Sequence, residues 1–102
     1  MNIAIFVSQN TEICLENYLP ANTTCLFCSE KTDAQLAAWQ VWKSCKIPFY
    51  VVLEGETAAE NRRAILSRAD LCLLFCRGAD IDVQLALHAA QEMRVPYRFF
   101  CV

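Results

Sequence analysis

Glycine, proline and histidine are scarce in this sequence. Its 102 residues contain two glycines, three prolines and one histidine. A chain of this length is expected to form one domain, residues 1–102. With so few residues that break helices and strands, most of that domain should lie in regular elements, and no linker, repeat or low-complexity stretch is evident.

A surplus of basic residues is also missing. Nine Lys and Arg face eleven Asp and Glu, which gives a net charge of −2. Nucleic-acid-binding proteins usually carry a basic surplus, so nucleic acid is not an expected partner. No apolar run approaches the roughly 20 residues of a membrane-spanning helix, so no membrane partner is expected either. The first ten residues, MNIAIFVSQN, lack the basic segment and cleavage site of a signal peptide.

Hydrophobic residues, by contrast, are abundant at 56% of the chain. Ordinary domains are about 45–50% apolar, so this chain should bury more than one layer of side chains. Seven of these residues are cysteines, an odd number. Most lie in apolar, strand-like runs, where a free thiol behaves as a small hydrophobe. The sequence therefore predicts reduced cysteines and a cytoplasmic location.

Two cysteine patterns bear on redox and metal chemistry. Cys25 and Cys28 have the spacing of a redox motif, but such motifs open a helix, and this pair lies along an expected strand. A zinc site needs four ligands in tetrahedral spacing, which one histidine and strand-bound cysteines do not offer. We therefore expect no metal site and no cofactor. His88, on the polar side of an expected helix, is interpreted as solvated.

Apolar runs rich in β-branched and aromatic residues alternate with helical patterns along the whole chain. The expected strands are residues 2–7, 24–28, 49–53, 71–76 and 97–101. The expected helices are residues 32–46, 57–68 and 80–93, with a short helix at most over 11–19. Alternation with short connections and right-handed crossovers predicts an α/β fold. We expect a Rossmann-like three-layer α/β/α sandwich around a five-stranded, mostly parallel sheet.

Helix starts carry recognisable capping patterns. Thr32 with Gln35, and Thr57 with Glu60, have the spacing of a capping box, and Asp80 is an expected N-cap. In the first long helix, apolar residues recur at helical spacing and predict one buried stripe. The members of that stripe are Ala34, Ala38, Val41, Trp42 and Cys45.

The last helix has apolar residues on two sides. Its sheet-facing stripe consists of Val83, Ala86, Leu87 and Ala90. Ile81 and Leu85 point almost the opposite way. They are interpreted either as contacts to a neighbouring helix of the same chain or as a homodimer contact.

Open α/β sheets bind ligands at the carboxyl ends of their strands, where the strand order reverses. If residues 2–7 form a central strand, several polar residues meet at that rim, and Glu54 and Gly55 follow the third strand nearby. The predicted ligand-binding residues are Ser8, Gln9, Ser29, Glu30, Lys31, Arg77 and Gly78. Arg77 is interpreted either as stacking on a base or holding a carboxylate, or as a salt bridge to Asp80 or Asp82.

Two segments resemble a known family. They are CSEKTDAQLAAWQVWKSCKIPFYVV, residues 28–52, and AENRRAILSRADLCLLFCRGADIDVQLALHAAQEMRVPYRFF, residues 59–100. They resemble the loop–helix–strand and helix–strand–Gly turn–helix–strand units of small stand-alone members of the SLOG superfamily. These Rossmann-like nucleotide-binding proteins include cytokinin-activating phosphoribohydrolases and a DNA-processing protein. The resemblance implies a nucleotide-type pocket at the strand ends.

The chain departs from that family where phosphate would bind. The family places a glycine-rich loop after its second strand, whereas residues 28–33 contain no glycine, and only Gly78 remains of a second such turn. Asp80 and Asp82 put like charge at a helix start that would otherwise favour an anion. Asn61 falls near the family's Arg-Asn pair, but Glu60 precedes it.

The sequence is compatible with three functions. The first is a non-catalytic sensor domain that binds a nucleotide or another small molecule. The second is a hydrolase of an N-glycosidic bond, with Glu30, Asp33 or Glu54 as the available carboxylates. The third is a degenerate structural or interaction module. In all three, Trp42 is expected in the core, and Arg62, Arg63 and Arg68 are expected on a solvated face, paired with Glu56 or Glu60.

Overall fold

The computed structural model describes residues 1–102 and contains one sheet of five parallel strands in the order β3-β2-β1-β4-β5. The strands are β1 Asn2–Val7, β2 Cys25–Cys28, β3 Phe49–Val51, β4 Leu71–Cys76 and β5 Tyr97–Cys101. The helices are α1 Thr32–Cys45, α2 Ala58–Ser67 and α3 Ile81–Glu92, with a short 3₁₀ helix, η1, at Leu15–Tyr18. The predicted α/β class and five-stranded sheet are confirmed.

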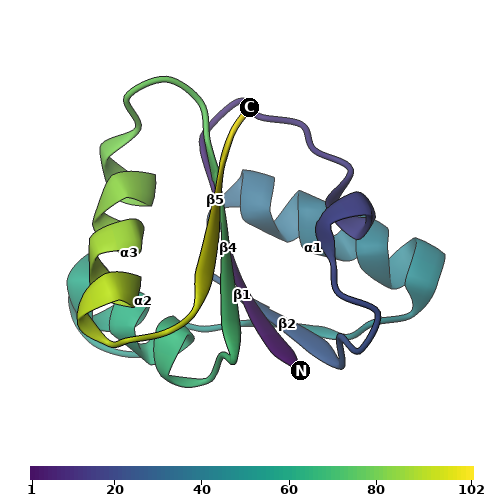
Figure 1. Ribbon diagram of the computed structural model, residues 1–102, viewed down its shortest axis with the longest axis horizontal. Coiled ribbons are helices and arrows are strands. Elements are labelled where there is room, and N and C mark those ends of the chain that lie inside the picture. Colours follow the sequence, from purple (N-terminus) through teal and green to yellow (C-terminus); the bar gives the residue numbers. More distant parts are fainter.

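The sheet separates two groups of buried side chains. Alternate residues of one strand point to opposite faces, so Ile3 and Ile5 pack under α1 and η1, while Ala4 and Phe6 pack under α2 and α3. Figure 1 shows the sheet edge-on, with α1 and η1 on its right and α2 and α3 on its left. All six residues of β4 are buried because both faces of this strand are covered.

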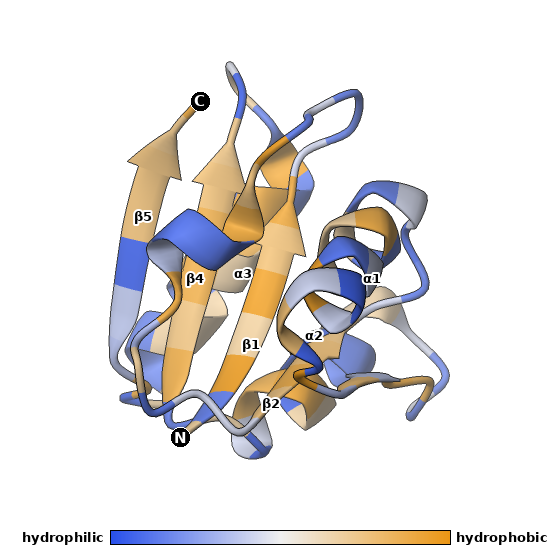
Figure 2. Cartoon of the chain, turned by 90° about the vertical axis from the view of Figure 1, so that its right-hand side faces the viewer, coloured by the Kyte–Doolittle hydropathy of each residue, from blue (hydrophilic) through white to orange (hydrophobic).

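The first crossover is a short 3₁₀ turn. Leu15 is buried in η1, and the ring of Tyr18 packs edge-on against Phe75 and Phe100, with centroid distances of 4.9 and 4.8 Å. In Figure 2, η1 lies in front of β4. This single turn therefore covers the part of the sheet that α1 does not reach.

Strand β3 is shorter than predicted. It ends at Val51 rather than at Leu53, because its only partner, β2, ends at Cys28. Tyr50 is 53% exposed at this edge, although its ring stacks on Phe27 at 5.5 Å. An edge position explains the exposure, because β3 has a neighbour on one side only.

Two of the three predicted caps are present. Thr57 accepts a hydrogen bond from the Glu60 N–H at 3.1 Å, and Asp80 accepts one from the Val83 N–H at 3.2 Å. The capping box of Thr32 and Gln35 is wrong. Thr32 is already inside α1 and Lys31 is the N-cap residue, without a side-chain cap.

The buried stripe of α1 is narrower than predicted. Ala34, Ala37, Ala38 and Val41 are buried, but Trp42 is 41% exposed, so its assignment to the core is wrong. Its ring lies beneath the Lys46 ammonium, 5.5 Å from the centroid. Only small side chains fit where α1 lies closest to the sheet. The larger indole of Trp42 therefore lies at the edge of the buried face of α1.

Several remaining predictions concern the surface. In α3, Ile81 is 70% and Leu85 is 43% exposed, so no neighbouring helix of this chain covers them.

All seven cysteines are free thiols. None of the helices has the length and apolar character needed to cross a membrane.

Candidate functional site

The strand order reverses between β1 and β4, and a hydrogen-bonded junction joins their carboxyl ends. Ser8, the residue after β1, is buried, and its N–H donates to the Phe75 carbonyl at 2.9 Å. Its Oγ accepts a hydrogen bond from the Arg77 N–H, also at 2.9 Å. The predicted residue Ser8 therefore closes the crevice between the two strands and has no surface left for a ligand.

The Asp80 carboxylate lies beside this junction, at the start of α3. Burial raises the pKa of Asp80, but hydrogen bonds from the Val83 N–H and the Ser8 hydroxyl outweigh burial. The N–H groups of Asp82 and Gln9 also donate, and together the donors hold the pKa below its ordinary value. The N-terminus of α3, which could otherwise bind an anion, is thus occupied by a carboxylate of the chain itself.

An open cleft of about 480 Å³ lies further along the same rim, and we call it the rim cleft. It lies beyond the carboxyl ends of β1, β2 and β3, between the first turns of the three α-helices. Three predicted residues, Ser29, Glu30 and Lys31, line it. Phe6 and Val83 contribute apolar wall, so the cleft combines polar and apolar surface.

The other predicted residues are elsewhere. Gln9 is exposed and does not line the rim cleft. Gly78 is exposed, with φ +66°, and a Cβ added there would meet nothing within 4 Å. Arg77 lines a separate, wider cleft of about 910 Å³ between α1 and the segment after β1. The seven predicted residues therefore do not line one cleft.

Arg77 has a backbone partner. Its Nη1 donates to the Asn10 carbonyl at 2.8 Å, and no carboxylate lies within ion-pair distance. The alternative of a salt bridge to Asp80 or Asp82 is therefore wrong. Asp33 lies in the same wide cleft and accepts a hydrogen bond from the Asn10 N–H at 3.3 Å.

An ion pair and an unpaired arginine set the electrostatics of the rim cleft. Lys31, before α1, pairs with Asp82 in the first turn of α3. Arg62, in α2, also lines the cleft, is half-buried and pairs with no carboxylate. Arg62 was expected on a solvated face, paired with Glu56 or Glu60, and this pairing is wrong. Its position near the start of a helix that follows a strand end was a usable signal for the cleft.

Side chains of α2 fix the loop that forms one wall. Asn61 Oδ1 accepts a hydrogen bond from the Glu54 N–H at 2.8 Å, and the Glu60 carboxylate accepts one from the Glu56 N–H at 2.7 Å. Glu60 therefore does not complete a capping box by accepting from Thr57. Gly55 has φ +85°, and a Cβ there would lie 2.5 Å from Glu60 Cβ. Only glycine fits this close approach.

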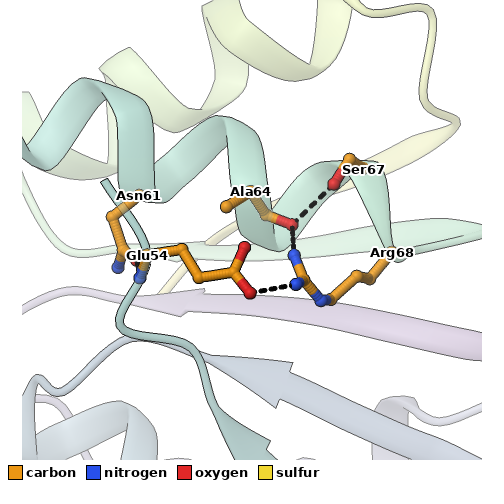
Figure 3. A network of polar contacts seen from close by, with 5 residues as sticks. All are labelled: Glu54, Asn61, Ala64, Ser67 and Arg68. Atoms are coloured by element: carbon orange, nitrogen blue, oxygen red, sulfur yellow. Dashed lines mark hydrogen bonds and ion pairs between the residues drawn. The ribbon is translucent and has the colours of Figure 1, made fainter.

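Glu54 is engaged away from the rim cleft. Its carboxylate forms an ion pair with Arg68, whose Nη1 donates to the Ala64 carbonyl at 2.7 Å (Figure 3). Arg63 pairs with Glu92 at 3.5 Å. The expected pairing of these two arginines with Glu56 or Glu60 is wrong, because the partners come from the preceding loop and from α3.

Comparison of the chain with protein-family models, curated protein sequences and solved structures gives no match. The site is therefore described by its own chemistry. The rim cleft has a volume within the range of about 300–1,000 Å³ usual for small-molecule sites. It offers one unpaired guanidinium, the hydroxyl of Ser29 and apolar wall, which suit a molecule with one anionic group and a flat or apolar body.

Proposed function

We propose that the chain is a non-catalytic binding domain of SLOG type, which holds a nucleotide or related small molecule in the rim cleft. The observation that carries this proposal is the position of a ligand-sized cleft at the carboxyl ends of three parallel strands. Ligands of open α/β sheets bind at this edge, near the reversal of strand order. The arginine of the cleft, Arg62, supplies a contact for an anionic group.

The positions of the carboxylates support binding over hydrolysis. A glycosidic hydrolase needs a carboxylate within hydrogen-bond reach of the bound ribose. Of the three candidates, Glu54 is paired with Arg68, and Asp33 lines the wide cleft. Glu30 is the only one of these three candidates that lines the rim cleft.

Isothermal titration with a panel of nucleosides and nucleotides tests the proposal. We expect micromolar or tighter binding of at least one member. Ala58 lines the rim cleft in the first turn of α2, whereas its neighbour Ala59 is exposed and lies outside the cleft. An Ala58→Trp variant should therefore lose binding, while Ala59→Trp should keep it.

Two results would contradict the proposal. The first is that no member of the panel binds detectably to the folded protein. The second is binding that Ala58→Trp leaves unchanged, because the ligand would then lie elsewhere. Release of free base from a nucleoside monophosphate, abolished by Glu30→Gln, would instead favour the hydrolase.

A second candidate function is a homodimeric interaction module. Ile81 and Leu85 lie one turn apart on α3 and are 70% and 43% exposed, and they support a contact with a second copy through this helix. Light scattering should give the mass of a dimer, and Ile81→Ser with Leu85→Ser should give the monomer. A dimer without small-molecule binding would favour this function over the first.

We further propose a reducing, cytoplasmic environment. Cys14, Cys45 and Cys101 are exposed free thiols. In an oxidising compartment, exposed thiols would be prone to oxidation or intermolecular pairing. Thiol titration of protein isolated under alkylating conditions should find seven reduced cysteines, and fewer would contradict this placement.

A further inference from the structure

The rim cleft has more negatively charged than positively charged side chains. Glu30, Glu56 and Asp82 provide three carboxylates, whereas Lys31 and Arg62 provide two cations. A phosphate-binding cleft usually has the opposite balance, because each phosphate needs cations or backbone N–H groups. This difference bears on which nucleotides the cleft can hold, and the inference below rests on the proposed function.

One of the two cations is already neutralised. The Lys31 ammonium pairs with the Asp82 carboxylate, and the two side chains are 44% and 56% exposed. Lys31 belongs to the loop before α1 and Asp82 to α3, so the ion pair joins two walls of the cleft. Arg62 is the remaining cation and is free to contact a ligand.

The backbone sites usual for phosphate are reduced to the start of α1, where the N-cap residue Lys31 has no side-chain cap. The loop of residues 28–33 has no glycine, so its side chains prevent close approach of a phosphate to the main chain. The start of α3 is capped by the carboxylate of Asp80. A second or third phosphate that extends toward α3 would therefore meet carboxylates rather than donors.

We propose that the rim cleft selects nucleosides and nucleoside monophosphates over di- and triphosphates. Arg62 holds the single phosphate. Asp82 excludes further phosphates, both by neutralising Lys31 and by adding its own negative charge. The affinity of the cleft for a ligand thus falls as the number of phosphates on the ligand rises above one.

Titration of the full chain with one nucleoside and its mono-, di- and triphosphate tests this proposal, with EDTA present so that no divalent cation neutralises the phosphates. The monophosphate should bind at least about tenfold more tightly than the triphosphate. Asp82→Asn should improve triphosphate binding by about fivefold, the size of an exposed charge interaction.

Arg62 is tested separately as the phosphate contact. Arg62→Gln should reduce the affinity for the monophosphate to that of the wild-type protein for the nucleoside. The control is Glu92→Gln, which removes a carboxylate from an exposed ion pair outside the cleft. This control should change none of the affinities, and circular dichroism verifies that each variant is folded.

The outcomes separate the two proposals. A triphosphate that binds as tightly as the monophosphate would overturn the selectivity but leave the binding function intact. An unchanged preference in Asp82→Asn would overturn the role of Asp82. Failure of every nucleoside and nucleotide to bind would overturn both proposals together.

Discussion

The backbone N–H of Arg77 donates a 2.9 Å hydrogen bond to Oγ of Ser8, which joins the loop after β4 to the loop after β1. The Ser8 N–H in turn donates to the Phe75 carbonyl, so this buried residue bonds to the β4 segment through both its backbone and its side chain. A serine hydroxyl thus occupies the crevice at the reversal of strand order. The space for a ligand is displaced to the neighbouring rim cleft.

Ser8→Ala should therefore destabilise the fold. The variant removes the hydrogen bond that the Arg77 N–H donates and the one that the Ser8 hydroxyl donates to Asp80, and each such bond contributes about 0.5–1.5 kcal/mol. Urea unfolding should show a loss of this size. Ser29→Ala is the control, because the Ser29 hydroxyl is half-buried and accepts only a long 3.4 Å hydrogen bond from Lys31, so it should change stability by less than about 0.5 kcal/mol. Equal effects of the two variants would contradict this role of Ser8.

The charge of Asp80 should stabilise the fold in a pH-dependent way. Its folded-state pKa lies below the ordinary value of 3.8, so in acid the unfolded chain binds more protons than the folded chain. This contribution is complete above about pH 5 and is lost as the pH falls through the folded-state pKa. Asp80→Asn keeps a side chain that caps α3 but removes the charge.

The measurement compares the free energy of unfolding of wild type and Asp80→Asn between neutral and acid pH. Wild type should be the more stable at neutral pH, and the difference should shrink in acid. The exposed Glu92 should show little of this behaviour when changed to Gln, since an exposed ion pair contributes at most about 1 kcal/mol. A difference that stays constant with pH would contradict the prediction.

The two glycines should differ in their tolerance of alanine. Gly55 and Gly78 both have left-handed backbones, with φ +85° and +66°, and alanine pays about 1–2 kcal/mol for such a backbone. At Gly55 the new Cβ would also lie 2.5 Å from Glu60 Cβ, whereas at Gly78 it would meet nothing within 4 Å. We expect Gly55→Ala to lose at least about 1 kcal/mol more than Gly78→Ala in denaturant unfolding. Equal losses of stability in the two variants would contradict the prediction, because the loop before α2 would then accommodate the added methyl group.

Two buried thiols should make the fold sensitive to alkali. Burial raises the pKa of Cys28 to about 11 and that of Cys72 to about 12, from an ordinary value of 9.0. The folded chain therefore keeps these protons where the unfolded chain loses them, so stability is complete below pH 9.0 and falls as the pH rises above it. Each thiol contributes up to about 1.4 kcal/mol per pH unit to this slope.

The Cys28→Ala, Cys72→Ala double variant isolates that contribution. It should be less stable than wild type near neutral pH, because both thiols fill the core. Its stability should nevertheless fall less steeply between pH 9 and about pH 11, as measured by urea unfolding at each pH. Parallel curves for the two proteins would contradict the prediction.

Local patterns predicted the elements well where both faces of an element are covered. The run of residues 71–76 is apolar throughout and became the fully buried β4. The same sequence patterns gave wrong predictions for residues at the edge of a buried face. Trp42 fits the apolar stripe of α1 by spacing, yet the sheet packs against Ala34, Ala38 and Val41 and leaves the larger ring outside. Helical spacing gives the direction of a side chain but not its distance from the neighbouring layer.

The candidate site was predictable in position and only partly in composition. The rim and three of its residues, Ser29, Glu30 and Lys31, follow from the rule for parallel sheets. The remaining predicted residues belong to a junction, a second cleft or open surface. Gly55 was expected near the rim and lines the cleft. Arg62 was expected on a solvated face, and its place in the cleft depends on how α2 packs at the ends of strands distant in sequence.

The sequence by itself determined the alternating elements, the parallel sheet and the edge at which polar residues gather, because these follow from periodicity and chain connectivity. Only the tertiary structure decided which side chains pair with one another and which stay unpaired. Lys31 meets Asp82 across 51 residues, Arg62 is left without a carboxylate, and Ser8 closes the crevice. The physical reason is that periodicity assigns a side chain to a face, whereas its partner comes from another element whose position only the packed layers define.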